Sequence, residues 1–170
     1  MPDDTTSSSH PRASWTSAEI GLAIGSVLLI TLVAFEELAA TTIMPTVVAS
    51  FDAAAWYPVA SGAALATQLS ATVVAGALAD WKGPRLVLFG GMVLFAVGLV
   101  ISAVAPTIII FVVGRALQGL GGGLLVVPLY VLIGAVASPG HRPVFFAAFS
   151  LAWVLPSLVG PAIAGHVTEV

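Results

Sequence analysis

A single arginine, Arg115, stands inside an apolar segment that extends from about residue 107 to residue 137. It has no other lysine, arginine or acid within twenty residues on either side. A charge in a segment long enough to cross a bilayer is costly unless it is paired or hydrated. Such an arginine is therefore a candidate functional residue, and a carboxylate elsewhere in the chain is the partner that would neutralise it.

Two adjacent acids in the first apolar segment, Glu36 and Glu37, are the candidates for that partner. If the segments alternate in direction, Glu36 lies roughly 18 Å and Arg115 roughly 12 Å from the same membrane surface, at about 1.5 Å per helical residue. Two long side chains can bridge that difference, which predicts that Glu36 contacts Arg115. Adjacent helical residues point about 100° apart, so Glu37 must face another group. The alternative is that the pair holds two helices together and has no other role.

The composition is that of a membrane protein. Hydrophobic residues make up 59% of the chain and charged residues 8%, against roughly 45–50% and 25% in soluble domains. The five lysines and arginines are scattered, which argues against a nucleic-acid partner. The chain has no cysteine, and His10, His141 and His166 lie far apart, so we expect neither a metal site nor a cofactor.

Five apolar segments, each near the roughly 20 residues that cross a bilayer, predict an all-α integral membrane protein. The polar residues 1–17 are predicted to be a disordered tail. The basic residues Arg12, Lys82, Arg85 and Arg142 all fall on the side of the amino terminus, which predicts a cytoplasmic amino terminus. The predicted transmembrane helices cover about residues 19–48, 58–79, 86–104, 107–137 and 143–167.

Small residues four positions apart predict places where two helices approach closely. The glycines from Gly119 to Gly123 belong to this class, because no strand precedes them and a phosphate loop would need one. The predicted contact pairs are Gly119 with Gly123, Gly21 with Gly25, Gly62 with Ala66, and Gly160 with Ala164.

The connection between the second and third predicted helices has the most specific pattern. Its letters are G-A-L-A-D-W-K-G-P-R, from Gly76 to Arg85. This resembles the signature between helices 2 and 3 of the major facilitator superfamily, G-x-L-a-D-r-x-G-r-k. The matching residues are Gly76, Leu78, Ala79, Asp80 and Gly83, with Arg85 in the final basic position, while Trp81 and Pro84 replace two basic residues.

Three further segments are similar to signatures of the same family. In the helix 4 signature R-x-x-q-G-x-g, which the family links to proton coupling, the matching residues are Arg115, Gln118 and Gly119. In the antiporter signature of helix 5, the matching residues are Gly160, Pro161 and Gly165, with Ala164 in place of a glycine. The segment from Glu36 to Pro45 is similar to the helix 1 pattern of the fourteen-helix drug:proton antiporters, with Thr41 in place of its asparagine.

The resemblance implies a secondary transporter of the plasma membrane that exports a small amphipathic molecule or drug in exchange for protons. It implies that Glu36 and Arg115 couple protons, with Glu37 as an additional candidate acid. We expect Gln68 and Tyr130 to contribute polar groups to the cavity or to helix packing. No nucleophile, metal cluster or phosphate loop is recognisable, so we expect no enzymatic activity.

The family has two six-helix halves, so the chain corresponds to helices 1 to 5 of an incomplete amino-terminal half. The implied partners are membrane lipid, protons, an unidentified small molecule and the missing second half. The alternative is a membrane fragment with a structural or regulatory packing role and no transport of its own.

Overall fold

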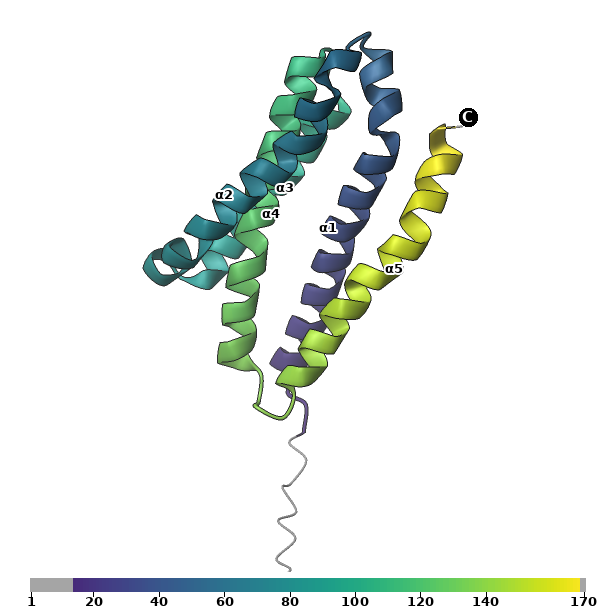
Figure 1. Cartoon of the computed structure of the whole chain (residues 1–170). Coiled ribbons are helices and arrows are strands. Elements are labelled where there is room, and N and C mark those ends of the chain that lie inside the picture. Colours follow the sequence, from purple (N-terminus) through teal and green to yellow (C-terminus); the bar gives the residue numbers. More distant parts are fainter. Residues whose placement is uncertain (1–13, 169–170) are drawn as a thin grey trace, which may run out of the picture.

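The computed structural model describes residues 14–168, including all side chains except those of Leu155 and of residues 158–168. The described residues form helices that run alternately up and down (Figure 1). The predicted tail, including Arg12, lies outside them up to residue 13. The elements are α1 (Ser17–Ser50), the short 3-10 helix η1 (Ala54–Trp56), α2 (Tyr57–Lys82), α3 (Pro84–Ala103), α4 (Ile108–Val136) and α5 (Arg142–Thr168).

Four helical segments among the described residues are long and apolar enough to cross a membrane. They are Ser17–Ser50, Ala54–Lys82, Pro84–Ala103 and Ile108–Val136. In α5 the apolar run with described side chains covers only Arg142–Val154. With 34 residues, α1 is about 50 Å long, well beyond the roughly 30 Å of a hydrocarbon core.

Local sequence signals set the helix ends. Thr16 precedes α1 and forms a capping box with Glu19, and the Thr107 side chain accepts from Ile110 N–H at the start of α4. These caps satisfy backbone donors that the first turn of a helix leaves free. Gly83 alone joins α2 to α3, with φ at 85°, a conformation that glycine adopts without strain, and Pro84 then begins α3.

Close packing among α2, α3 and α4 depends on glycines of α4. A Cβ on Gly119 would lie 2.0 Å from the Ala64 carbonyl oxygen of α2, and one on Gly123 would lie 2.3 Å from that of Gln68. A Cβ on Gly121 would lie 2.4 Å from the backbone nitrogen of Phe95 on α3. Only glycine permits these approaches, which confirms the predicted contact at Gly119 and Gly123.

Among the described residues, the predicted contacts at Gly21, Gly25 and Gly62 are wrong. A Cβ at any of the three would meet no described atom within 4 Å. Gly21 and Gly25 line an open apolar groove, with Leu88 and Met92 of α3 on its other side, so no described helix backbone lies against them. The fourth predicted pair, Gly160 with Ala164, lies outside the described side chains.

The helices fall into two packed groups. Helix α4 packs closely against both α2 and α3, and α1 packs most closely against α5 (Figure 1). Side chains of α1 and α5 also reach α4, where Leu22 of α1 packs against a buried cluster that contains Ile133 of α4 and Phe145 of α5. At one end, Met44 and Val48 of α1 pack against Ala60 of α2 and Phe111 of α4 in a buried apolar cluster. This cluster holds the α1–α5 pair to the α2–α3–α4 group at that end.

A polar cluster holds the two groups together at the opposite end. The Glu19 side chain is buried, and its Oε1 accepts from the backbone N–H and the hydroxyl of Ser138, both at 2.7 Å. His141 Nδ1 lies 3.1 Å from the same oxygen, and Trp15 stacks on the His141 ring with centroids 4.1 Å apart. Together with Thr16, which donates to Oε2 at 2.9 Å, these residues form what we term the Glu19 clasp. It fastens the start of α1 to the loop between α4 and α5.

Candidate functional site

Arg115 of α4 forms a buried ion pair with Glu36 of α1. The arginine side chain is 6% exposed and that of Glu36 is 15% exposed, and Arg115 Nη1 donates to Glu36 Oε1. The same nitrogen donates to Gln118 Oε1, one turn along α4, at 3.1 Å. The structure therefore brings together the two residues whose depths predicted a contact, and it places Gln118 of the helix 4 signature beside them.

Ser102 of α3 extends this arrangement to a third helix. Its hydroxyl donates to Gln118 Oε1 at 3.3 Å. Helix α3 comes this close because a Cβ on Gly114 would lie 2.4 Å from Ser102 Oγ, so glycine is required there. The sequence analysis missed Ser102, since one serine near the end of an apolar helix carries no signal of its own.

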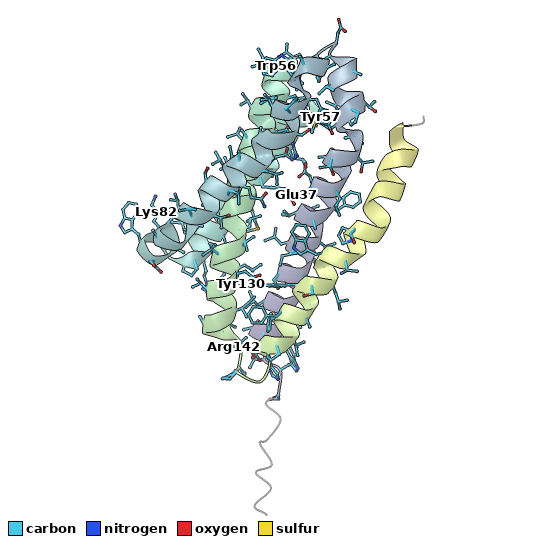
Figure 2. The ribbon with its side chains drawn as sticks, in the orientation of Figure 1. Glu37, Trp56, Tyr57, Lys82, Tyr130 and Arg142 are labelled. Atoms are coloured by element: carbon cyan, nitrogen blue, oxygen red, sulfur yellow. The ribbon has the colours of Figure 1, made fainter. Side chains whose placement is uncertain are left out.

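Glu37 faces away from Arg115 and toward α2. Its carboxyl is near the Gln68 side chain of that helix, and Figure 2 shows Glu37 at mid-height between α1 and the α2–α3–α4 group. Glu36, Glu37, Gln68 and Gln118 all line a small cavity of about 10 Å³, termed the small cavity below. The two adjacent acids thus have different neighbours but line the same small cavity.

A larger cavity of about 280 Å³ lies between α1, α2, α4 and α5. Its aromatic side is formed by Tyr130, Phe146, Phe149 and Trp153, and Tyr130 has its ring centroid 5.8 Å from that of Phe146 and 5.7 Å from that of Phe149. Its polar groups come from Tyr130, Ser150 and Gln68, and Gln68 also lines the small cavity. An apolar cavity with a few convergent polar groups is typical of small-molecule sites.

The other predicted site residues lie away from these cavities. Gly76, Asp80, Gly83 and Arg85 are at or near the α2–α3 connection, where Asp80 and Arg85 are exposed. Gly119 serves the contact with α2 described above. The side chains of the helix 5 signature, which contains Gly160, Pro161 and Gly165, are outside the described part of the chain.

Residues 26–170 match the protein family described as Major Facilitator Superfamily. The chain belongs to this superfamily. It is 30% identical over 145 residues to the uncharacterized transporter C3H1.06c of Schizosaccharomyces pombe, which covers 85% of the chain and 25% of that protein. No solved structure matches the chain.

Two further relatives have more specific names. The chain is 28% identical over 128 residues to the multidrug transporter protein MdtP of Bacillus subtilis, covering 75% of the chain and 24% of MdtP. It is 28% identical over 172 residues to the efflux pump roqT of Penicillium rubens, covering 99% of the chain and 31% of that pump. The chain thus spans about a quarter to a third of the length of these relatives.

Membership of the superfamily fixes the class of protein. Its members are multi-pass membrane transporters and not enzymes, which agrees with the all-helical fold and its four membrane-crossing segments among the described residues.

Proposed function

We propose that the chain is the amino-terminal part of a secondary transporter that exports a small amphipathic molecule in exchange for protons. Membership of a transporter superfamily supports the class, and the names of the MdtP and roqT relatives support export. The observation that carries the proton-coupling part is the buried ion pair between Glu36 and Arg115.

Glu36 acts as the coupling acid by changing its charge. Ionised Glu36 holds α1 to α4 through Arg115, and the attraction is strong because little water surrounds the pair. Protonation removes that attraction, while Arg115 keeps the Gln118 amide as an acceptor. Protonation therefore weakens the attachment of the α1–α5 pair to the α2–α3–α4 group, where apolar packing such as that of Val33 against Leu125 remains. This weakening links proton uptake to movement.

The larger cavity supplies one side of the substrate path. Its aromatic and aliphatic walls suit the apolar part of an amphipathic molecule, and Gln68 and Tyr130 offer it hydrogen bonds. In the complete protein a second half closes the path, as in other transporters built from two halves. Membrane lipid surrounds the exposed apolar faces.

The protein spans the plasma membrane with its amino terminus in the cytoplasm. The cations Lys82, Arg85 and Arg142 are exposed at the α2–α3 and α4–α5 connections, and cytoplasmic loops carry an excess of such residues. Trp56 and Tyr57 lie at the opposite end of the molecule from Arg142 (Figure 2), where aromatic side chains suit the outer interface.

Acid-to-amide substitutions in the complete transporter test this function. Glu36→Gln keeps the side-chain shape but cannot titrate, so it should abolish export driven by a pH gradient in proteoliposomes while the protein remains in the membrane. Glu37→Gln should be milder, with slower but still coupled export, because Glu37 is not paired with Arg115. The matched control Asp52→Asn changes an exposed acid with φ at 50°, which asparagine tolerates, and should transport normally.

Two results would contradict the assignment. If Glu37→Gln is inactive and Glu36→Gln is silent, the coupling role belongs to Glu37. If both variants transport normally at every pH tested, the ion pair only packs α1 against α4.

A further inference from the structure

The buried amide of Gln118 has an NH₂ group whose two donors are both unused among the described residues. Its side chain is almost fully buried, at 2% exposure. Its Oε1 accepts from Arg115 and Ser102, which fixes the orientation of the amide. Its Nε2 has no hydrogen-bond partner among the described residues. A buried N–H group without an acceptor is unfavourable, so a partner that is not part of the chain is expected at this atom.

The small cavity is the space in which that partner fits. Gln118 lines it, whereas Arg115 and Ser102, the donors to Oε1, do not. Its volume of about 10 Å³ is close to the lower limit for a single water molecule. Glu36, Glu37 and Gln68 also line this cavity, and their side chains are of the polar kind that buried waters need as partners.

We propose that the small cavity binds one water molecule and that this water carries a proton between Glu37 and Glu36. The water accepts a hydrogen bond from Gln118 Nε2 and bridges the two carboxyls. Protonated Glu37 gives its proton to the water, and the water gives one of its own protons to ionised Glu36. One carboxyl O–H bond breaks and another forms, the water is regenerated, and Glu37 is left ionised.

The position of Glu37 makes it the entry point of this relay. Gln68 lines both cavities and interacts with the Glu37 carboxyl, so it links Glu37 to the larger cavity. The titratable groups around the small cavity are Glu36 and Glu37 from α1, with Arg115 of α4 behind Glu36. Helices α2 and α3 contribute Ala64, Gln68 and Phe95, which do not titrate. The role of the relay in transport rests on the proposed function, whereas the water site does not.

Infrared difference spectroscopy of the whole chain in lipid bilayers tests the water site. The probe is water enriched in the heavy oxygen isotope, which shifts the O–H stretching band of a bound water during a pH step. We expect such a band in the unaltered protein and its loss in Gln118→Met. Gln118→Leu should also lose it, because its side chain likewise has no polar group to hold the water. Ser102→Ala is the matched control and should keep the band, since the Ser102 hydroxyl bonds Gln118 at Oε1 and not at Nε2.

The carboxyl stretching bands test the proton transfer. After a rapid pH step, protonation of Glu36 should be several-fold slower in Glu37→Gln and in Gln118→Met than in the unaltered protein. Absence of an isotope-sensitive band in the unaltered protein, or its persistence in both Gln118 variants, would overturn the water site. Unchanged Glu36 protonation in Glu37→Gln would overturn the relay.

Transport data separate this inference from the proposed function. If the water band and the relay are observed but Glu36→Gln still exports normally, the proposed function fails and the relay stands. If Glu36→Gln abolishes export but no water band exists, the relay fails and the proposed function stands.

Discussion

Arg115 has two acceptors of different kinds, the Glu36 carboxylate of α1 and the Gln118 amide of its own helix. The carboxylate balances its charge, and the amide holds its guanidinium in position. Because Gln118 in turn accepts a hydrogen bond from Ser102 of α3, a change in the charge of Glu36 affects a hydrogen-bond network on three helices. The pair is therefore suited to respond to a proton, beyond holding two helices together.

Removing the cation should be more damaging than neutralising the acid. Arg115→Ala leaves Glu36 buried without its partner, and the free energy of unfolding should fall by about 3–5 kcal/mol. The double variant Glu36→Leu with Arg115→Met should recover most of that loss, because apolar side chains can replace a buried ion pair, yet it should not couple protons. Denaturant unfolding in detergent and transport in proteoliposomes measure the two effects. Equal stability of Arg115→Ala and the unaltered protein would show that the pair contributes nothing to the fold.

At the level of the helices, a glycine is required for packing where the backbone of a neighbouring helix lies against it. Gly119→Ala would push a Cβ into the Ala64 carbonyl, so it should separate α2 from α4 and lower the free energy of unfolding by about 1–3 kcal/mol. Gly25→Ala, whose Cβ meets nothing within 4 Å, is the matched control. It should leave stability unchanged or raise it by up to about 1 kcal/mol, because alanine favours helix. Equal losses in the two variants would contradict this account of α2–α4 packing.

Sequence patterns predicted the helices and the ion pair because each depends on the position of residues along the chain and not on how the helices pack. Span length located the apolar helices, and depth along α1 and α4 was enough to pair Glu36 with Arg115. The spacing of Gly21 and Gly25 showed that small residues lie on one face of α1. Spacing does not indicate which helix, if any, packs against that face. Ser102 was missed for a related reason, since its partner Gln118 is known only once α3 and α4 are packed.

At the scale of the whole molecule, alternating helices fix on which side of the membrane each end lies. A reporter that is active only outside the cell should be active when it is fused after Val170, because five spans follow a cytoplasmic amino terminus. The same reporter fused after Lys82 should be inactive, since that connection is expected in the cytoplasm, and this fusion serves as the control. Inactivity of the Val170 fusion would mean that one span is misassigned, and it would remove the depth argument for the pair of Glu36 and Arg115.

Among the described residues, the walls of the larger cavity come from α1, α2, α4 and α5. If a second half supplies the remaining wall, the 170-residue chain expressed alone should confer no proton-driven efflux. Loss of a fluorescent amphipathic dye from vesicles, with and without an uncoupler, measures this. Uncoupler-sensitive efflux from vesicles that contain only this chain would contradict the expectation and would indicate that copies of the chain complete one another.

The Glu19 clasp also bears on the order in which the protein is assembled during synthesis. Ser138 follows Glu19 by 119 residues in the chain, so a ribosome that adds about 5–20 residues per second makes it roughly 6 to 24 seconds later. Throughout that interval the nascent α1 has only Thr16 as a partner for Glu19, and its main packing partner, α5, has not been made. Helices α2, α3 and α4 can complete their mutual packing as they emerge, whereas α1 gains its main packing partner only when α5 has been made. The first helix to be made is therefore among the last to complete its packing.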